Sequence, residues 1–200
     1  MEYSSLIFGY AFYVLATVGT PGPNNIMLAS SGANFGFKRS IPHALGVNLG
    51  FVFMLVMVGL GLGQIFVTYP IIHDIMRFVG AAFLLYLAFK IATSKSKSAT
   101  GKSTSSPLTF IQAAAFQWVN PKAWVMIIGA IATFISIGGD KFTELGIMVL
   151  VNFCVGLPLI FAWCLFGREI GRFLKSERAF LIFNYIMASL LAISVLTLFW

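Results

Sequence analysis

Two short polar stretches interrupt apolar sequence and carry residue types that bind small polar molecules inside a membrane. Residues 20–25 read Thr-Pro-Gly-Pro-Asn-Asn, and residues 117–122 read Gln-Trp-Val-Asn-Pro-Lys. Prolines remove backbone donors, and the glycine at position 22 tolerates dihedrals closed to other residues, so a helix is expected to break at each stretch. Unpaired backbone groups in a bilayer are costly unless they face protein or water. We therefore expect the breaks to line a site, with a proline kink that binds no ligand as the alternative.

The chemistry expected at such a site is the binding of a small zwitterion. The exposed amino end of a half-helix beginning near residue 23 attracts a carboxylate, while unwound carbonyls and asparagine oxygens receive an ammonium group. Asn48 and Asn152 each lie in the span after a break, and tying helices together is their alternative role. No carboxylate falls at membrane depth, and we expect no metal or cofactor. The predicted substrate-binding residues are Pro21, Gly22, Pro23, Asn24, Asn25, Asn48, Gln117, Asn120, Pro121, Lys122 and Asn152.

Lys122 is the most informative of these residues because it lies near the middle of an apolar run. Its side chain reaches about 6 Å, whereas the bilayer interface is about 15 Å away, half the thickness of the hydrocarbon core. Its ammonium group should therefore face a polar interior. Without substrate we expect it to bond to asparagine or backbone carbonyls, or to lose its proton. The alternative is a span displaced by several residues, which would place Lys122 nearer the interface.

The elements that must position these residues are membrane helices. Of 200 residues, 59% are hydrophobic and 10% charged, more apolar surface than a soluble domain of this size can bury. The composition thus predicts an all-α polytopic membrane protein in contact with the lipid bilayer. We expect the first apolar segment to be retained rather than cleaved. Runs long enough to span fall at about 4–34, 41–68, 70–93, 108–137, 142–167 and 179–199.

These six spans divide into two sets of three. Residues 94–107 are rich in Ser and Lys, as in a flexible linker. They separate a first three-helix repeat, 1–93, from a second, 108–200. Each half has a break with proline and asparagine in its first helix and an asparagine in its second. This pattern predicts two inverted repeats whose first and fourth helices are broken, the organisation of many secondary transporters.

Basic residues predict the orientation. Ten of the thirteen lie in or beside the loops after the first, third and fifth spans. The positive-inside rule places those loops in the cytoplasm and both termini outside. The same rule explains the net charge of +7, so we expect no nucleic-acid partner.

Other function classes lack their signatures. No catalytic motif is present, and Gly101-Lys102-Ser103-Thr104 lacks the first glycine of a P-loop, so we do not expect an enzyme. A thiol-disulfide electron carrier is one alternative, but Cys154 and Cys164 lie in the same span, about 15 Å apart at the rise of a helix. A non-transporting assembly or scaffold protein is another. Four Gly-x-x-x-Gly pairs predict close helix packing, with a homodimer face as the alternative: Gly32/Gly36, Gly46/Gly50, Gly59/Gly63 and Gly167/Gly171.

The chain resembles the LysE/RhtB superfamily of amino-acid exporters. The resemblance is carried by residues 20–25, by Gly36-Phe37-Lys38-Arg39, by residues 80–90 and by Asn120-Pro121-Lys122. Within the superfamily the chain is most similar to the cysteine and O-acetylserine exporters, through Asn24-Asn25 and residues 117–120. The resemblance implies a six-helix exporter of small amino acids or their derivatives in the bacterial inner membrane, driven by the proton motive force.

One departure from the family concerns proton coupling. Some relatives carry an acidic residue in the fifth span, where this sequence has Asn152. A carboxylate proton relay is therefore not expected here. The candidate proton carriers are His43, Lys122 and the substrate itself. The sequence leaves open which amino acid is exported and the oligomeric state.

Overall fold

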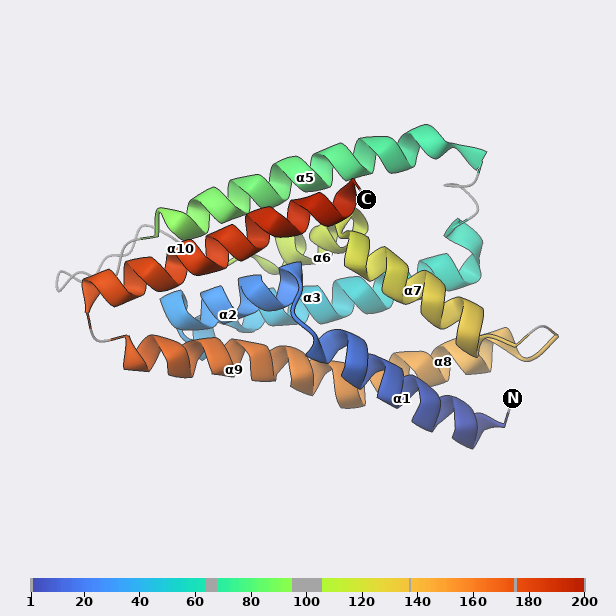
Figure 1. Ribbon diagram of the computed structural model, residues 1–200. Helices are drawn as coiled ribbons and strands as arrows, with labels where there is room; N and C mark the ends of the chain where they lie inside the picture. Colours follow the sequence, from blue (N-terminus) through green and yellow to red (C-terminus); the bar gives the residue numbers. More distant parts are fainter. Residues whose placement is uncertain (1, 64–67, 95–105, 137, 175, 200) are drawn as a thin grey trace.

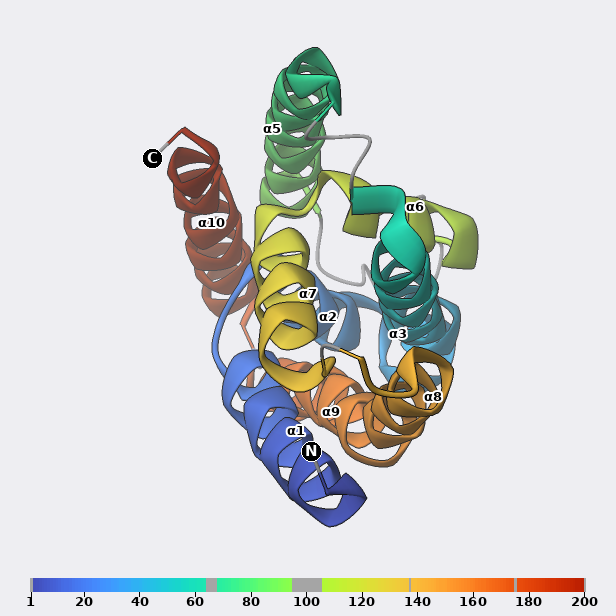
Figure 2. The same cartoon turned by 90° about the vertical axis from the view of Figure 1, so that its right-hand side faces the viewer.

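The protein is an elongated bundle of helices, most of which run roughly along its length (Figures 1 and 2). Its structure, a computed structural model, describes residues 2–63, 68–94, 106–136, 138–174 and 176–199. No strand occurs among these residues, so the all-helical fold class is confirmed. The helices are α1 (Tyr3–Gly19), α2 (Pro23–Phe35), α3 (Phe37–Met57), η1 (Val58–Leu62), α5 (Pro70–Ala92), α6 (Phe110–Val119), α7 (Pro121–Phe134), α8 (Lys141–Val151), η2 (Asn152–Gly156), α9 (Leu157–Phe173), α10 (Glu177–Ile193) and η3 (Ser194–Leu198).

Several of these helices are long and apolar enough to cross a membrane. Four qualify within the described residues: Phe37–Leu62, Asp74–Ala92, Lys141–Phe173 and Glu177–Leu196. A fifth span results if α1 and α2, which meet at a bend of 61°, are counted together. The predicted span at 108–137 consists of the shorter helices α6 and α7. The protein is therefore a multi-pass membrane protein.

The surface of the bundle is apolar, as contact with lipid requires. Large hydrophobic side chains are more than 70% exposed on several helices, including Phe8 and Phe12 on α1, Val125 on α7 and Phe173 on α9. A soluble protein rarely exposes so many large apolar groups. Most linker residues, 95–105, lie outside the described residues, as does the sequence that imitates a P-loop.

Local sequence explains where the helices of the second half begin. Thr109 and Gln112 form a reciprocal capping box at the start of α6. Asp140 accepts hydrogen bonds from the backbone at the start of α8, and Ser176 does so for α10. The long helix that contains α8 and α9 continues through the π-helical turn η2, where Asn152 lies. Cys154 and Cys164 share this helix and are both free thiols.

The bundle has two ends, the linker end and the N-terminal end. The linker end contains the α2–α3 turn, the last turn of α5, the first turn of α6 and the α9–α10 connection (Figure 1). The N-terminal end contains the start of α1, η1 and the α7–α8 connection. The buried hydrophobic residues form one cluster that includes Leu28, Leu84 and Phe116 and another that includes Leu6 and Met148.

The Gly-x-x-x-Gly pairs did not all behave as predicted. A Cβ added at Gly32, Gly46, Gly50, Gly167 or Gly171 would meet the backbone of a neighbouring helix of the same chain, which confirms the packing role of these five. Gly36 instead has φ of +79° in the α2–α3 turn, and no neighbour lies within 4 Å of an added Cβ. The prediction for Gly36 was therefore wrong, because this glycine serves the turn.

Candidate substrate-binding site

The first break lies between α1 and α2. Thr20 and Gly22 are extended, and the carbonyls freed at the end of α1 find a side-chain donor. Asn25 Nδ2 donates to the Val18 carbonyl at 2.7 Å and to the Thr20 carbonyl at 2.8 Å. Asn25 thus stabilises the break by satisfying backbone groups that the prolines leave unpaired.

Gly22 has a different role from the one expected. Its φ is −176°, an extended conformation open to any residue, so the predicted need for special dihedrals was wrong. A Cβ at this position would lie 2.8 Å from Lys122 Cδ and 3.1 Å from Lys122 Nζ. The lysine side chain passes directly over the backbone of Gly22, so a side chain added here would displace it.

The second break lies between α6 and α7 and is organised by Asn120. Its side-chain oxygen accepts from the backbone N–H of Lys122 at 3.2 Å, and its own N–H donates to the Gln117 carbonyl at 3.2 Å. Trp124 Nε1 donates to the Trp118 carbonyl at 2.7 Å. As at the first break, side chains satisfy the carbonyls where the helix ends.

The two breaks are joined to each other. Lys122 Nζ donates to the Thr20 carbonyl and Thr20 Oγ1, each at 2.9 Å, and to the Pro21 carbonyl at 3.2 Å. The amides of Asn24 and Gln117 pair reciprocally at 2.8 and 3.2 Å. Of the partners expected for the ammonium group of Lys122, asparagine or backbone carbonyls, the structure shows backbone carbonyls, together with the Thr20 hydroxyl. Its ammonium group therefore links the first half of the chain to the second.

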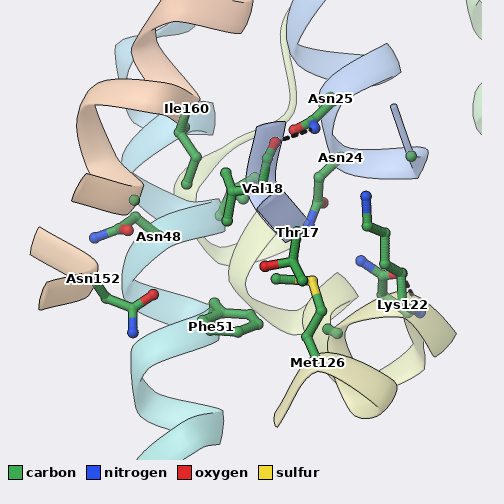
Figure 3. A pocket seen from close by; sticks show the side chains of 15 residues that line it. Thr17, Val18, Asn24, Asn25, Asn48, Phe51, Lys122, Met126, Asn152 and Ile160 are labelled. Carbon is green, nitrogen blue, oxygen red and sulfur yellow. Dashed lines mark hydrogen bonds between the residues drawn. The ribbon is translucent and has the colours of Figure 1, made fainter. Parts of the chain in front are cut away.

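A cavity with about 490 Å³ of empty space lies beside the joined breaks (Figure 3). Seven of the predicted site residues line it: Gly22, Asn24, Asn25, Asn48, Asn120, Lys122 and Asn152. The other four, Pro21, Pro23, Gln117 and Pro121, do not line it; Pro21 and Gln117 bond to residues that do.

Asn48 and Asn152 lie across the cavity from Lys122 (Figure 3). Asn152 Nδ2 donates to Tyr10 Oη at 2.7 Å and to the Met148 carbonyl at 2.9 Å, so its side-chain oxygen is the atom left for a ligand. Asn48 is 1% exposed, and its Nδ2 makes no hydrogen bond to the described part of the chain. A Cβ on Gly156 would lie 3.4 Å from Asn152 Oδ1 and 3.7 Å from Asn48 Oδ1. Two amide oxygens therefore flank the same glycine.

The cavity is polarised from end to end. One end has the ammonium group of Lys122 and the first turn of α2, where Asn24 and Asn25 lie. Helix amino ends carry a partial positive charge and unpaired N–H groups. The other end has the amide oxygens of Asn48 and Asn152. Among the described residues that line the cavity there is no carboxylate, so the arrangement suits a molecule with a carboxylate and an ammonium group.

The apolar wall of the cavity was not predicted. Val18, Phe51, Met126 and Ile160 line it, together with Thr17. The sequence did carry a signal for two of these residues. Phe51 follows Asn48 by three residues and Ile160 follows Gly156 by four, and such spacings place residues on the same face of a helix. The bond between Tyr10 and Asn152 had no such signal, because the two residues are far apart in sequence.

Comparisons with known proteins give a consistent set of relatives. The family model described as LysE type translocator matches residues 15–198. The chain is 39% identical over 131 residues to a cysteine/O-acetylserine efflux protein of Salmonella paratyphi A, covering 65% of this chain and 66% of the relative. It is 36% identical over 132 residues to the protein of the same name from Escherichia coli O1:K1, covering 66% of each. These alignments span slightly less than two thirds of either relative, and no solved structure matches the chain.

Proposed function

The chain belongs to the LysE-type translocator family, and from that premise we propose that it exports small amino acids or their derivatives across the bacterial inner membrane. The observation that carries the proposal is the polarised cavity at the two joined helix breaks. Broken helices that meet at a polar cavity are the usual binding element of secondary transporters. The relatives named above are called cysteine/O-acetylserine efflux proteins, which makes those two compounds the first substrates to test.

The substrate is oriented by the two ends of the cavity. Its carboxylate binds at the first turn of α2, next to Lys122, where backbone donors and the lysine charge attract an anion. Its ammonium group binds the side-chain oxygens of Asn48 and Asn152. Phe51, Met126 and Ile160 enclose the short side chain. A small neutral amino acid satisfies both polar ends, whereas a metal cation would have no carboxylate ligand here.

The finer architecture is part of this proposal. Six spans form two inverted repeats, in which α6 and α7 together make the fourth span. Each repeat begins with a helix broken at a proline and continues with a span that places an asparagine at the cavity. The exporter uses the proton motive force, with His43, Lys122 or the substrate carrying the proton, and a homodimer remains a candidate assembly.

Both termini face outward in this proposal because the linker end is the basic end. Lys38 and Arg39 lie at the α2–α3 turn, while Arg172 and Arg178 flank the α9–α10 connection. The check is labelling with an impermeant thiol reagent in a background without Cys154 and Cys164. A cysteine at Glu2 should react in intact cells, and one at Glu177 should react only after permeabilisation. Reaction at Glu177 in intact cells would contradict the orientation.

The proposed function is tested by counterflow in liposomes. Wild-type protein should exchange O-acetylserine or cysteine. Lys122→Met removes the charge at similar length, and we expect it to weaken binding by about 1.5–3 kcal/mol, or roughly 10- to 150-fold, because a charged hydrogen bond is lost. Lys141→Met is the matched control, since Lys141 begins α8 and does not line the cavity.

The wild-type result tests the export function, and the Lys122→Met result tests the role of the lysine. Failure of the wild-type protein to exchange any amino acid would contradict the export function. Normal exchange by a folded Lys122→Met protein would reduce Lys122 to a structural link between the breaks and leave the asparagines as the binding residues.

A further inference from the structure

A second cavity lies at the linker end, apart from the central one. It has about 450 Å³ of empty space, close to the 490 Å³ of the central cavity. Residues from α2, α3 and α5 line it, joined by residues just before α6. Its polar lining consists of Ser30, Ser31, Asn34, His43, Lys90, Ser94 and Ser106.

His43 leaves an unpaired polar atom in this region. The side chain is 1% exposed, and Nδ1 lies 2.9 Å from the hydroxyl of Ser31. Nε2 is buried and has no hydrogen-bond partner among the described residues. Leaving a buried polar group unpaired is costly, so a ligand that bonds to Nε2 would remove this penalty.

The charge of the cavity favours an anion. Lys90 lines it and forms no ion pair within the described part of the chain, and no carboxylate is found among the described lining residues. Ser30 and Ser106 add hydroxyl groups to the lining, whereas the hydroxyl of Ser94 already donates to Asn34 Oδ1. Lysine and hydroxyl groups together are suited to a carboxylate.

The main side-chain acceptor in the cavity is already occupied. Asn34 Oδ1 accepts from Ser94 Oγ at 2.8 Å and from Asn184 Nδ2 at 3.3 Å. Asn34 Nδ2 donates in turn to Asn184 Oδ1 at 3.0 Å. An ammonium group would therefore have to compete with bonds that tie α2 to α10. The second cavity differs in this respect from the central one, where amide oxygens face the ligand.

The two cavities are adjacent along the same helices. His43 precedes Asn48 by five residues in α3, about 7.5 Å along the helix axis. On α2, Asn24 lines the central cavity and Met27, three residues later, lines the second. Val47 lines the central cavity, Met27 lines the second, and both belong to the same buried hydrophobic cluster.

We propose that this second cavity is a loading site that binds the carboxylate of the amino acid before it enters the central cavity. The inference rests on the proposed export function, because it places the site on the cytoplasmic route to the centre. The substrate carboxylate binds Lys90, His43 and the hydroxyls of Ser30 and Ser106, and its ammonium group makes no essential contact. Passage to the centre then requires Met27 and Val47 to move apart. The second cavity thus selects for a carboxylate, and the central cavity selects for the complete zwitterion.

The test uses everted membrane vesicles that contain the full chain, with uptake of radiolabelled O-acetylserine from the cytoplasmic face. Lactate, a carboxylate without an amino group, should inhibit this uptake by competition but should not itself be transported. Lys90→Met should raise KM about tenfold with little change in maximal rate, because a charged hydrogen bond at the loading site is lost. It should also abolish inhibition by lactate.

Two further variants complete the experiment. Lys38→Met is the matched control, since Lys38 is exposed at the same end and does not line the cavity, and it should leave KM and lactate inhibition unchanged. His43→Leu should lose lactate inhibition as well. If that variant does not fold, Lys90→Met, at the edge of the bundle, still decides the question.

The results distinguish this inference from the export function. Normal uptake by wild type with no effect of lactate, or an unchanged KM in Lys90→Met, would overturn the loading site and leave export intact. No uptake by wild type under any gradient would overturn export. Transport of lactate itself would overturn the division of selectivity between the two cavities.

Discussion

The two ends of the bundle are closed in different ways. At the linker end, helices touch backbone to backbone. A Cβ on Gly167 of α9 would overlap the carbonyl of Ala29 in α2, and one on Gly32 would overlap the carbonyl of Cys164. A Cβ on Gly46 of α3 would likewise overlap the carbonyl of Phe110 in α6. Glycine permits these approaches because it has no side chain.

At the N-terminal end, side chains fill the space between helices. A Cβ on Gly9 would meet the ring of Phe134 at 3.1 Å, and one on Gly129 would meet Tyr13 Oη at 3.0 Å. Tyr10, Tyr13 and Phe134 pack together with ring centroids 5.4 to 6.1 Å apart.

This difference indicates that the linker end is the more tightly sealed of the two. Side chains change rotamer readily, whereas backbone contacts separate only when whole helices move. Under the proposed inverted repeat, the packing of α2 on α9 at the linker end corresponds to that of α7 on η1 at the N-terminal end. Under the proposed export function the substrate enters from the linker end, so we expect the glycine contacts there to separate during transport.

The largest expected effect is at Gly167. Gly167→Val should force α9 away from α2 and destabilise the protein by about 3 kcal/mol, because the new side chain overlaps backbone that cannot rotate away. Gly146→Ala is the control, since no atom lies within 4 Å of its added Cβ, and it should stabilise α8 by about 0.5–1 kcal/mol. Thermal unfolding in detergent measures both changes. Equal stability of Gly167→Val and wild type would remove the distinction between the two ends.

A smaller effect is expected at Tyr10, which belongs to the N-terminal end. Tyr10→Phe removes the acceptor for Asn152 Nδ2, which keeps its bond to the Met148 carbonyl. We expect the free energy of unfolding to fall by about 1 kcal/mol, the usual net contribution of one hydrogen bond. Substrate binding should also weaken, because the side chain of Asn152 is less well fixed. The control is Tyr69→Phe, at a tyrosine that is 58% exposed. A stability loss above that of Gly167→Val would show that the N-terminal end is the more rigid one.

The smallest effect concerns the α7–α8 connection. Hydrogen bonds from the Thr143 side chain and backbone lower the pKa of Asp140 below its ordinary value of 3.8. A lowered pKa means that Asp140 stabilises the fold above its unfolded pKa, and that this contribution is lost as the pH falls through the folded pKa. Thr143→Ala should raise the pKa of Asp140 and weaken the cap of α8 slightly. A titration of stability between pH 5 and about 3 would detect the change, and identical curves for the two proteins would contradict the role of Thr143.

The sequence alone determined the features that depend on local chemistry. Proline lacks a backbone donor wherever it occurs, so Pro23 and Pro121 marked the starts of α2 and α7. Apolar runs of sufficient length predicted the helices and their approximate bounds. Lys122 in an apolar run had to find polar partners, and these were expected to be asparagine or backbone carbonyls unless the lysine lost its proton. The family could be recognised because its motifs surround these same breaks.

Only the tertiary structure decided how the breaks are used. It showed that the ammonium group of Lys122 is held by Thr20 and Pro21, and that the lysine side chain passes directly over Gly22. It also placed Asn48 and Asn152 across the cavity and gave Asn152 its partner Tyr10. These contacts join residues about a hundred or more positions apart in the chain, and their geometry depends on the packing of whole helices. Local sequence carries no record of such packing, so the partners of each polar side chain were visible only in the folded protein.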